Sequence, residues 1–106
     1  MTDSTIAIKK RAKSYKDVDE GTSCSQTSFK TGGKAFLFIG EQGGRRKAMF
    51  KLKQSRPDAV KLAKSDPDKF EIGSGAWVTA RFSDSDPMPV KLWKKWLDES
   101  YHLSAS

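Results

Sequence analysis

Residues 20–53 carry the signals that decide the fold, and they read EGTSCSQTSFKTGGKAFLFIGEQGGRRKAMFKLK. Strand-like segments alternate here with two glycine-rich turns. Gly32 and Gly33 supply the pair of positive-φ residues that a two-residue hairpin turn needs. The glycines of residues 42–44 predict a second hairpin with a three-residue loop. The stretch therefore predicts a three-stranded antiparallel meander.

The two turns fix the register of this meander, and the register decides which side chains share a face. Phe29 is expected opposite Phe36, and Phe36 opposite Phe50. With Phe38 and Leu52 beside them, these rings predict the face that packs on the core. The other face is then expected to carry a mixed basic and apolar set: Lys30, Leu37, Ile39, Lys47, Met49, Lys51 and Lys53.

A further alternating segment lies at residues 76–82, after a short strand and a Gly-Ser-Gly turn. Its core-facing side chains are expected to be Val78, Ala80 and Phe82. The alternate positions place Trp77, Thr79 and Arg81 on the basic face of the meander. An indole on that face has no obvious apolar partner in the sequence, which makes Trp77 the most informative single residue.

Three segments outside the strands have helical signals. Residues 4–18 show only a weak apolar stripe and a run of basic residues. Residues 55–66 are expected to start with Ser55 as the N-cap. Residues 90–101 repeat large apolar side chains at helical spacing, so we expect Trp93 and its neighbours to plug the core.

The length of 106 residues suits one domain with a single modest core, spanning residues 1–106. Residues 1–5 and 104–106 are expected to be disordered. The only cysteine, Cys24, excludes an internal disulfide. The sequence shows neither a signal-peptide segment nor an apolar run of about 18 residues. We therefore expect a cytoplasmic protein with no membrane association.

The charge balance points to a class of partner. Twenty lysines and arginines stand against thirteen aspartates and glutamates, so the formal net charge is +7. Such an excess favours a polyanionic partner such as nucleic acid or an anionic membrane surface. The same charge can also serve solubility alone.

Several motifs together resemble the MmcQ/YjbR family across residues 15–103. They are the Gly-Thr-Ser at residues 21–23, the Phe-Lys…Gly-Lys-x-Phe pattern of residues 29–36 with one residue more in its turn, the isolated Trp77 and the Glu-Ser-Tyr at residues 99–101. The resemblance implies a compact α+β domain of CyaY-like architecture. In that architecture an antiparallel sheet of about four to five strands is packed on one face by two or three helices. It also implies similarity to the double-wing DNA-binding domain of a phage transcription factor.

The sequence offers no catalytic constellation. His102 is the only histidine, so a hydrolase triad would rest on one poorly placed base. Cys24 and His102 alone cannot form a zinc site. Frataxin-like proteins bind iron through an acidic ridge, which a chain of net charge +7 does not provide. We therefore expect no enzymatic activity, no cofactor and no metal.

Two functions of different classes remain. The first is a nucleic-acid-binding module, with DNA as the preferred ligand, in which basic residues contact phosphates and Trp77 stacks on a base or sugar. Its expected contact residues are Lys30, Arg45, Arg46, Lys47, Lys51, Lys53, Trp77 and Arg81. The alternative is a protein-interaction or homodimerisation surface centred on Leu37, Ile39, Met49 and Trp77. Lysine is depleted in interface cores and enriched on phosphate-binding surfaces, which favours a monomer that binds nucleic acid.

Overall fold

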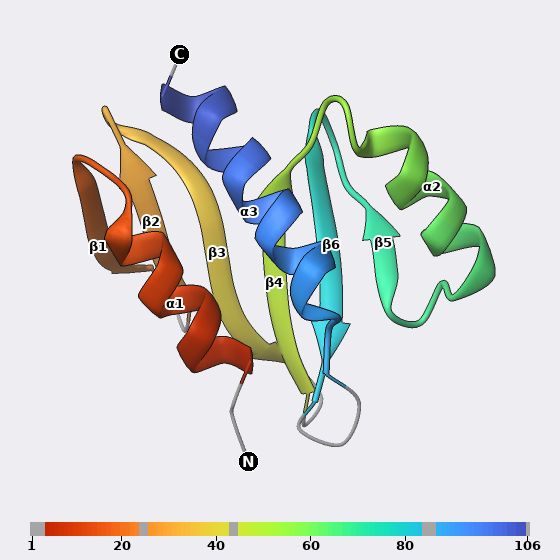
Figure 1. Cartoon of the computed structure of the whole chain (residues 1–106). Coiled ribbons are helices and arrows are strands. Elements are labelled where there is room, and N and C mark those ends of the chain that lie inside the picture. Colours follow the sequence, from red (N-terminus) through yellow and green to blue (C-terminus); the bar gives the residue numbers. More distant parts are fainter. Residues whose placement is uncertain (1–3, 24–25, 43–44, 84–86, 106) are drawn as a thin grey trace.

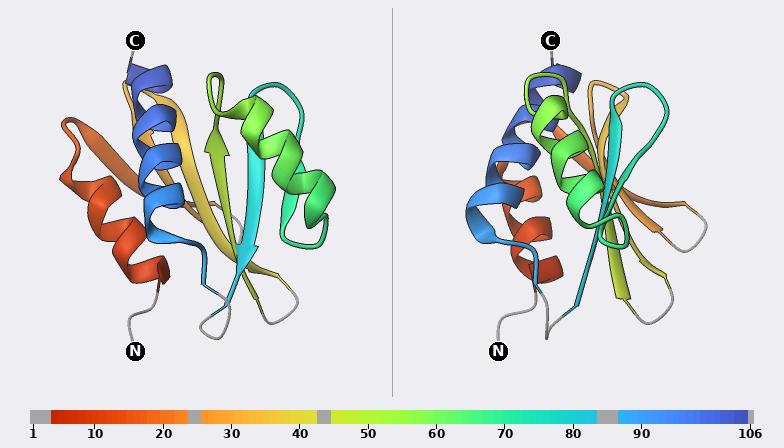
Figure 2. Two further views of the ribbon diagram at one scale, coloured as in Figure 1. Left: turned by 45° about the vertical axis from the view of Figure 1, so that its right-hand side comes forward. Right: turned by 90° about the vertical axis from the view of Figure 1, so that its right-hand side faces the viewer.

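The computed structural model describes residues 4–23, 26–42, 45–83 and 87–105. In chain order these residues form α1 (Ser4–Ser14), β1 (Val18–Ser23), β2 (Gln26–Thr31), β3 (Lys34–Gln42), β4 (Arg45–Lys51), α2 (Arg56–Ser65), β5 (Phe70–Ile72), β6 (Trp77–Phe82) and α3 (Val90–Ala105). The strands make one open antiparallel sheet in the order β1-β2-β3-β4-β6-β5. All three helices lie on the same side of it, so one face is covered and the other is open (Figure 1, Figure 2). No helix in the described ranges is long and apolar enough to cross a membrane.

The α+β class is confirmed, and the described sheet has six strands where four to five were expected. The additional strand is β1, whose sequence VDEGTS lacks the alternating apolar residues of a typical strand. It forms because it pairs along its whole length with β2 at the edge of the sheet. Residues 4–5 and 104–105, which were expected to be disordered, lie within the helices α1 and α3.

The first hairpin forms as predicted, but a bulge changes its register. Gly32 and Gly33 both have positive φ, and Thr31 pairs with Lys34 across them. The pairing then shifts by one residue between Lys30 and Phe29. An extra residue in one strand of this kind is a β-bulge, which moves every later pair by one position.

The second hairpin is shorter than predicted. Gln42 pairs with Arg45, which leaves two residues between them in place of the expected three. Phe50 consequently pairs with Leu37, and the expected Phe36–Phe50 pair is wrong. Phe29 also pairs with Leu37, so the expected Phe29–Phe36 pair is wrong as well.

These shifts exchange two sets of apolar side chains between the faces. Leu37 and Ile39, expected on the basic face, are buried in the core. Phe38, expected in the core, lies on the open face and is only half-buried. Phe36 is still buried because it sits in the bulge, where it packs edge-on against Tyr15 and Tyr101.

The core is closed by α3. Trp93, Trp96 and Leu97 are buried, as the helical spacing predicted, whereas Val90 is 54% exposed because it precedes the part of the helix that meets the sheet. α1 is held against α3 by a bidentate ion pair from Arg11 to Asp98. This connects the first and last helices across the covered face of the sheet.

The last helix also inserts a hydroxyl between two strands. Pairing of β3 with β4 stops at Leu37 and Phe50. Beyond that pair, the Ser100 hydroxyl accepts a hydrogen bond from the Lys51 N–H at 2.7 Å and donates one to the Phe36 carbonyl. Ser100 therefore satisfies two backbone groups that would otherwise pair with each other, and β3 and β4 separate at this point.

We expect Ser100→Ala to lower the free energy of unfolding by about 1 to 3 kcal/mol, because two buried backbone groups lose their partner. Urea unfolding at neutral pH measures the loss. Ser14→Ala is the matched control, since the Ser14 hydroxyl is bound only to the exposed Arg11 carbonyl of its own helix. That change should stay within about 0.5 kcal/mol. An equally small effect at Ser100 would contradict the role given to its hydroxyl.

Candidate functional site

No described helix covers the open face of the sheet (Figure 2). Its central row crosses four neighbouring strands and is formed by Ser28, Phe38, Met49 and Thr79. Ser28 and Thr79 are buried small polar residues in this row. Between them the larger side chains of Phe38 and Met49 stand out from the sheet.

An apolar group, here called the open-face cluster, consists of Phe38, Met49 and Trp77. The rings of Phe38 and Trp77 lie 5.2 Å apart at an angle of 52°, reaching toward each other past β4. The Lys51 ammonium lies 5.3 Å from the indole centroid, within the range of a cation–π contact. All three cluster side chains are half-buried, so part of each side chain stays exposed.

The cluster confirms that Trp77 lies on the open face, and it adds Phe38, which the sequence reasoning placed in the core. A signal for Phe38 was present in the sequence. Gly43-Gly44 has the same form as Gly32-Gly33, and a two-residue turn at both places gives the observed β3–β4 register.

Two of the expected cationic residues are held by carboxylates. Arg81 contacts Glu71 at 2.7 Å. Arg45 donates to the Asp68 carboxylate from both of its terminal guanidinium nitrogens, at 2.8 and 3.0 Å. The hydrogen bond and the charge of Arg81 lower the pKa of Glu71, and those of Arg45 lower the pKa of Asp68. Both acids therefore stay ionised at neutral pH, and a phosphate would have to compete with them.

Three lysines remain on the open face. Lys47 stands beside Arg81 in the next strand, and its charge also contributes to the lowered pKa of Glu71. Lys30 is exposed and lies opposite Asp19 of β1. Lys51 is half-buried, and its ammonium contacts the Ser104 hydroxyl at 3.3 Å as well as the indole. The prediction that Lys51 stands in solvent is thus wrong, because the gap between β3 and β4 lets it reach α3.

Two further expected residues do not lie on this face. Arg46 follows Arg45 in β4 and so points to the opposite side, where it lies near Thr5 and Lys9 of α1. Lys53 comes after the strand and shares a hollow with His102 of α3. Lys53, expected on the basic face, therefore lies away from it, and Arg46 does not share the open face with the other expected contact residues.

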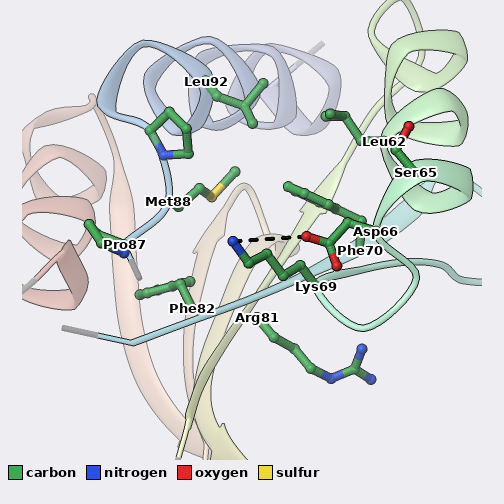
Figure 3. Close-up of a pocket in the computed structure, with 11 residues that line it drawn as sticks. Leu62, Ser65, Asp66, Lys69, Phe70, Arg81, Phe82, Pro87, Met88 and Leu92 are labelled. Carbon is green, nitrogen blue, oxygen red and sulfur yellow. Dashed lines mark ion pairs between the residues drawn. The ribbon is translucent and has the colours of Figure 1, made fainter. Parts of the chain in front are cut away.

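A separate hollow of about 200 Å³ lies between α2, β6 and the start of α3 (Figure 3). Its walls are mainly apolar, with Phe70, Phe82 and Met88 among them, and Arg81 points away from it (Figure 3). Lys69 and Asp66 form a 3.9 Å ion pair at its side. The hollow is therefore a mainly apolar space between packed elements.

Metal-binding side chains were also considered. In the described ranges, no three His, Cys, Asp or Glu side chains gather closely enough to hold a metal ion. His102 is exposed on α3. Cys24, the other candidate ligand, lies outside the described residues.

Comparison with protein families supplies the identification. The family model described as YjbR matches residues 13–103, which include seven of the nine elements completely, all but the last two residues of α3, and the last two residues of α1. The chain belongs to the YjbR family. The sequence-based assignment to MmcQ/YjbR is therefore confirmed. A comparison with curated proteins found no match.

The motifs behind the resemblance have structural roles in this YjbR chain. The Gly-Thr-Ser segment ends β1, the Gly32-Gly33 turn joins β2 to β3, and Ser100 links β3 to β4. Trp77 is different, because it contributes to the open-face cluster rather than to the buried core. Its half-buried side chain therefore forms part of the open face of the sheet.

Proposed function

We propose that this protein is a non-catalytic module that binds nucleic acid on the open face of its sheet, with a preference for single strands. The observation that carries the proposal is the pair of accessible rings, Phe38 and Trp77, 5.2 Å apart beside a lysine ammonium. Aromatic rings on a sheet surface stack on unpaired bases without strong sequence preference. DNA remains the proposed ligand, and RNA is a second arm of the test.

The shape of the surface supports single strands over duplex. Ser28, Gly40 and Thr79 are small, so the face around the open-face cluster has few side chains that could enter a groove. A duplex hides its base faces and would meet this surface only through phosphates. A single strand can place bases on the rings and its phosphates near Lys30, Lys47 and Lys51.

Salt dependence tests the electrostatic part. If the three open-face lysines each neutralise about one phosphate, log Kd should change with log salt by a slope of about 2 on single strands. Lys47→Glu should weaken binding of mixed-sequence DNA and lower this slope, as measured by fluorescence anisotropy. Lys61→Glu is the control, because Lys61 is exposed on α2 and makes the same charge change away from the face. Equal losses in the two variants would show that only the net charge matters.

We expect Trp77→Ala to weaken binding of single-stranded DNA by about 1 to 3 kcal/mol and to affect duplex DNA less. The reason is that only unpaired bases can stack on the indole. Trp77→Phe keeps a ring and should retain most of the affinity. A measurement of unfolding for each variant separates loss of the site from loss of the fold. Equal effects on single strands and duplex would argue against stacking.

A protein-interaction or homodimerisation role is the second candidate. The observation that favours it is the pairing of Arg45 with Asp68 and of Arg81 with Glu71, which surrounds the apolar cluster with neutralised charges. Interfaces commonly combine an apolar centre with such a polar rim. Sedimentation distinguishes the candidates, since a dimer that Trp77→Ala dissolves would support this role and displace the monomeric one.

The finer family relationships are part of the same proposal. A CyaY-like architecture agrees with an antiparallel sheet covered by helices on one face, and similarity to a double-wing DNA-binding domain agrees with a nucleic-acid ligand. Fold similarity supports function only by analogy. We also propose the cytoplasm as the compartment, because a chain with a single cysteine has no internal disulfide to keep oxidised.

A further inference from the structure

A shallow, open groove lies between α1 and α3, away from the open-face cluster. Figures 1 and 2 show these two helices on the covered side of the sheet. Its volume is about 440 Å³, and its lining is mainly apolar. Ala7 contributes from α1, and Val90 and Trp93 contribute from α3. Val90 is 54% exposed and is, with Ile6, one of the two exposed large apolar residues in the described ranges. The groove therefore presents apolar surface that the fold itself does not bury.

The rim of this groove is basic. Lys10 of α1 and Lys94 of α3 lie along it, and both are exposed. Among the described residues neither lysine has a carboxylate within ion-pair distance, whereas the neighbouring Arg11 is neutralised by Asp98 at 2.9 Å. The groove thus offers one unpaired positive charge on each wall. An occupant of complementary charge would carry acidic groups on both sides of an apolar stripe.

The shape of the groove favours one class of acidic partner over the others. A membrane surface is flat and would leave a hollow between two helices unfilled. A nucleic acid would place phosphates near the lysines but would leave Val90 and Ala7 without an apolar partner. An amphipathic helix can cover the apolar residues and also contact the lysines, because its apolar side chains enter a groove while the flanking residues face the rim.

We propose that the α1–α3 groove is a docking site for an acidic amphipathic helix of a partner protein. Apolar side chains of that helix cover Val90 and Ala7, and its carboxylates pair with Lys10 and Lys94. This site is independent of the nucleic-acid interface. The two surfaces lie on opposite sides of the sheet, so both ligands can bind at once.

The probe is a synthetic helical peptide with leucines at positions i, i+3, i+4 and i+7 and glutamates elsewhere, labelled for fluorescence anisotropy. The expected result is saturable binding to the wild-type protein and none of a peptide with lysine in place of glutamate. Lys10→Glu combined with Lys94→Glu should weaken binding by about tenfold or more. The matched control, Lys61→Glu combined with Lys64→Glu on α2, makes the same change in net charge and should leave binding unchanged.

A second variant tests the apolar floor. Val90→Asp places a charge at an exposed position in the first turn of α3, where a negative charge is favourable for the helix, so the fold should be retained. It should abolish peptide binding, and Trp77→Ala should not change it. Failure of the acidic peptide to bind the wild type, or equal losses in the α2 control, would overturn the proposal. Binding to phosphatidylserine vesicles that Val90→Asp abolishes, without peptide binding, would overturn it in favour of a membrane surface.

Discussion

Trp96→Ala is expected to lower the free energy of unfolding by about 3 to 5 kcal/mol, as other large-to-small changes of buried aromatic residues do. Trp96 is 1% exposed and meets the rings of Phe50 and Phe70 edge-on at 5.9 and 5.8 Å. It therefore joins α3 to both β4 and β5, and its truncation removes a large buried side chain from between them. Small domains have a total stability of only about 5 to 15 kcal/mol, so the variant should be partly unfolded at physiological temperature.

Denaturant unfolding of Trp96→Ala and Trp96→Phe measures this effect. The phenylalanine keeps one edge contact and should lose less than the alanine. Val90→Ala is the control in the same helix, because its exposed side chain should contribute no more than about 0.5 kcal/mol. A loss below about 1 kcal/mol for Trp96→Ala would mean that α3 is only loosely attached to the sheet.

Glu99→Ala is expected to cost roughly 2 to 4 kcal/mol at neutral pH, because one carboxylate accepts several hydrogen bonds from partly buried donors. It binds the Lys53 N–H at 2.6 Å, the Ser55 N–H at 3.1 Å and the Ser55 hydroxyl at 2.7 Å. Ser55 occupies the predicted N-cap position of α2, but its side chain makes no capping hydrogen bond because its hydroxyl donates to Glu99 instead. The carboxylate thus fastens the connection from β4 to α2 onto α3.

The stabilisation by Glu99 depends on pH because it requires the ionised carboxylate. Burial alone would raise the pKa of Glu99, but hydrogen bonds from Ser55 and from the Lys53 N–H outweigh it and hold the pKa below its ordinary value. A lowered pKa in the folded state stabilises the protein above the unfolded pKa of about 4.3, and this stability is lost as the pH falls through the folded value. Glu99→Gln should therefore destabilise the protein most at neutral pH and less in acid.

Urea unfolding of the wild type and Glu99→Gln, from about pH 7 to about pH 3, isolates this contribution. The comparison is needed because Asp68, Glu71 and Asp98 also have lowered pKa values and contribute to acid sensitivity in both proteins. A difference between the two proteins that does not vary with pH would exclude the charge of Glu99 as its source.

Local signals were sufficient for much of the fold. The Gly32-Gly33 turn, the alternation that places Trp77 on the open face and the helical spacing around Trp93 all depend on neighbours in the sequence, and the structure confirms each of them. β1 was missed because it depends on its partner strand rather than on its own pattern. The register of β3 against β2 was missed because of the bulge, which lies beside a contact with Ser100, 64 residues away in the chain. The register of β3 against β4 was missed because Gln42 was counted as part of the loop.

The candidate site likewise has one part that the local sequence predicts and one part that depends on contacts between distant residues. Alternation along β4 and β6 was enough to place Lys47, Trp77 and Arg81 on one face. Nothing in local sequence showed that Arg81 would be held by Glu71, since that contact depends on β5 pairing beside β6. Arg45 is held by Asp68 for a similar reason, because the two residues are 23 positions apart.

The Ser100 hydroxyl between β3 and β4 imposes an order on folding. Each hairpin of the sheet can form from residues close together in the chain, but this end of the sheet is completed only when α3 arrives. The two hydrogen bonds of Ser100 join residues separated by 49 and 64 positions, and α3 follows every described strand. During synthesis the strands therefore leave the ribosome before the group that joins them, so the final sheet forms late and depends on long-range closure.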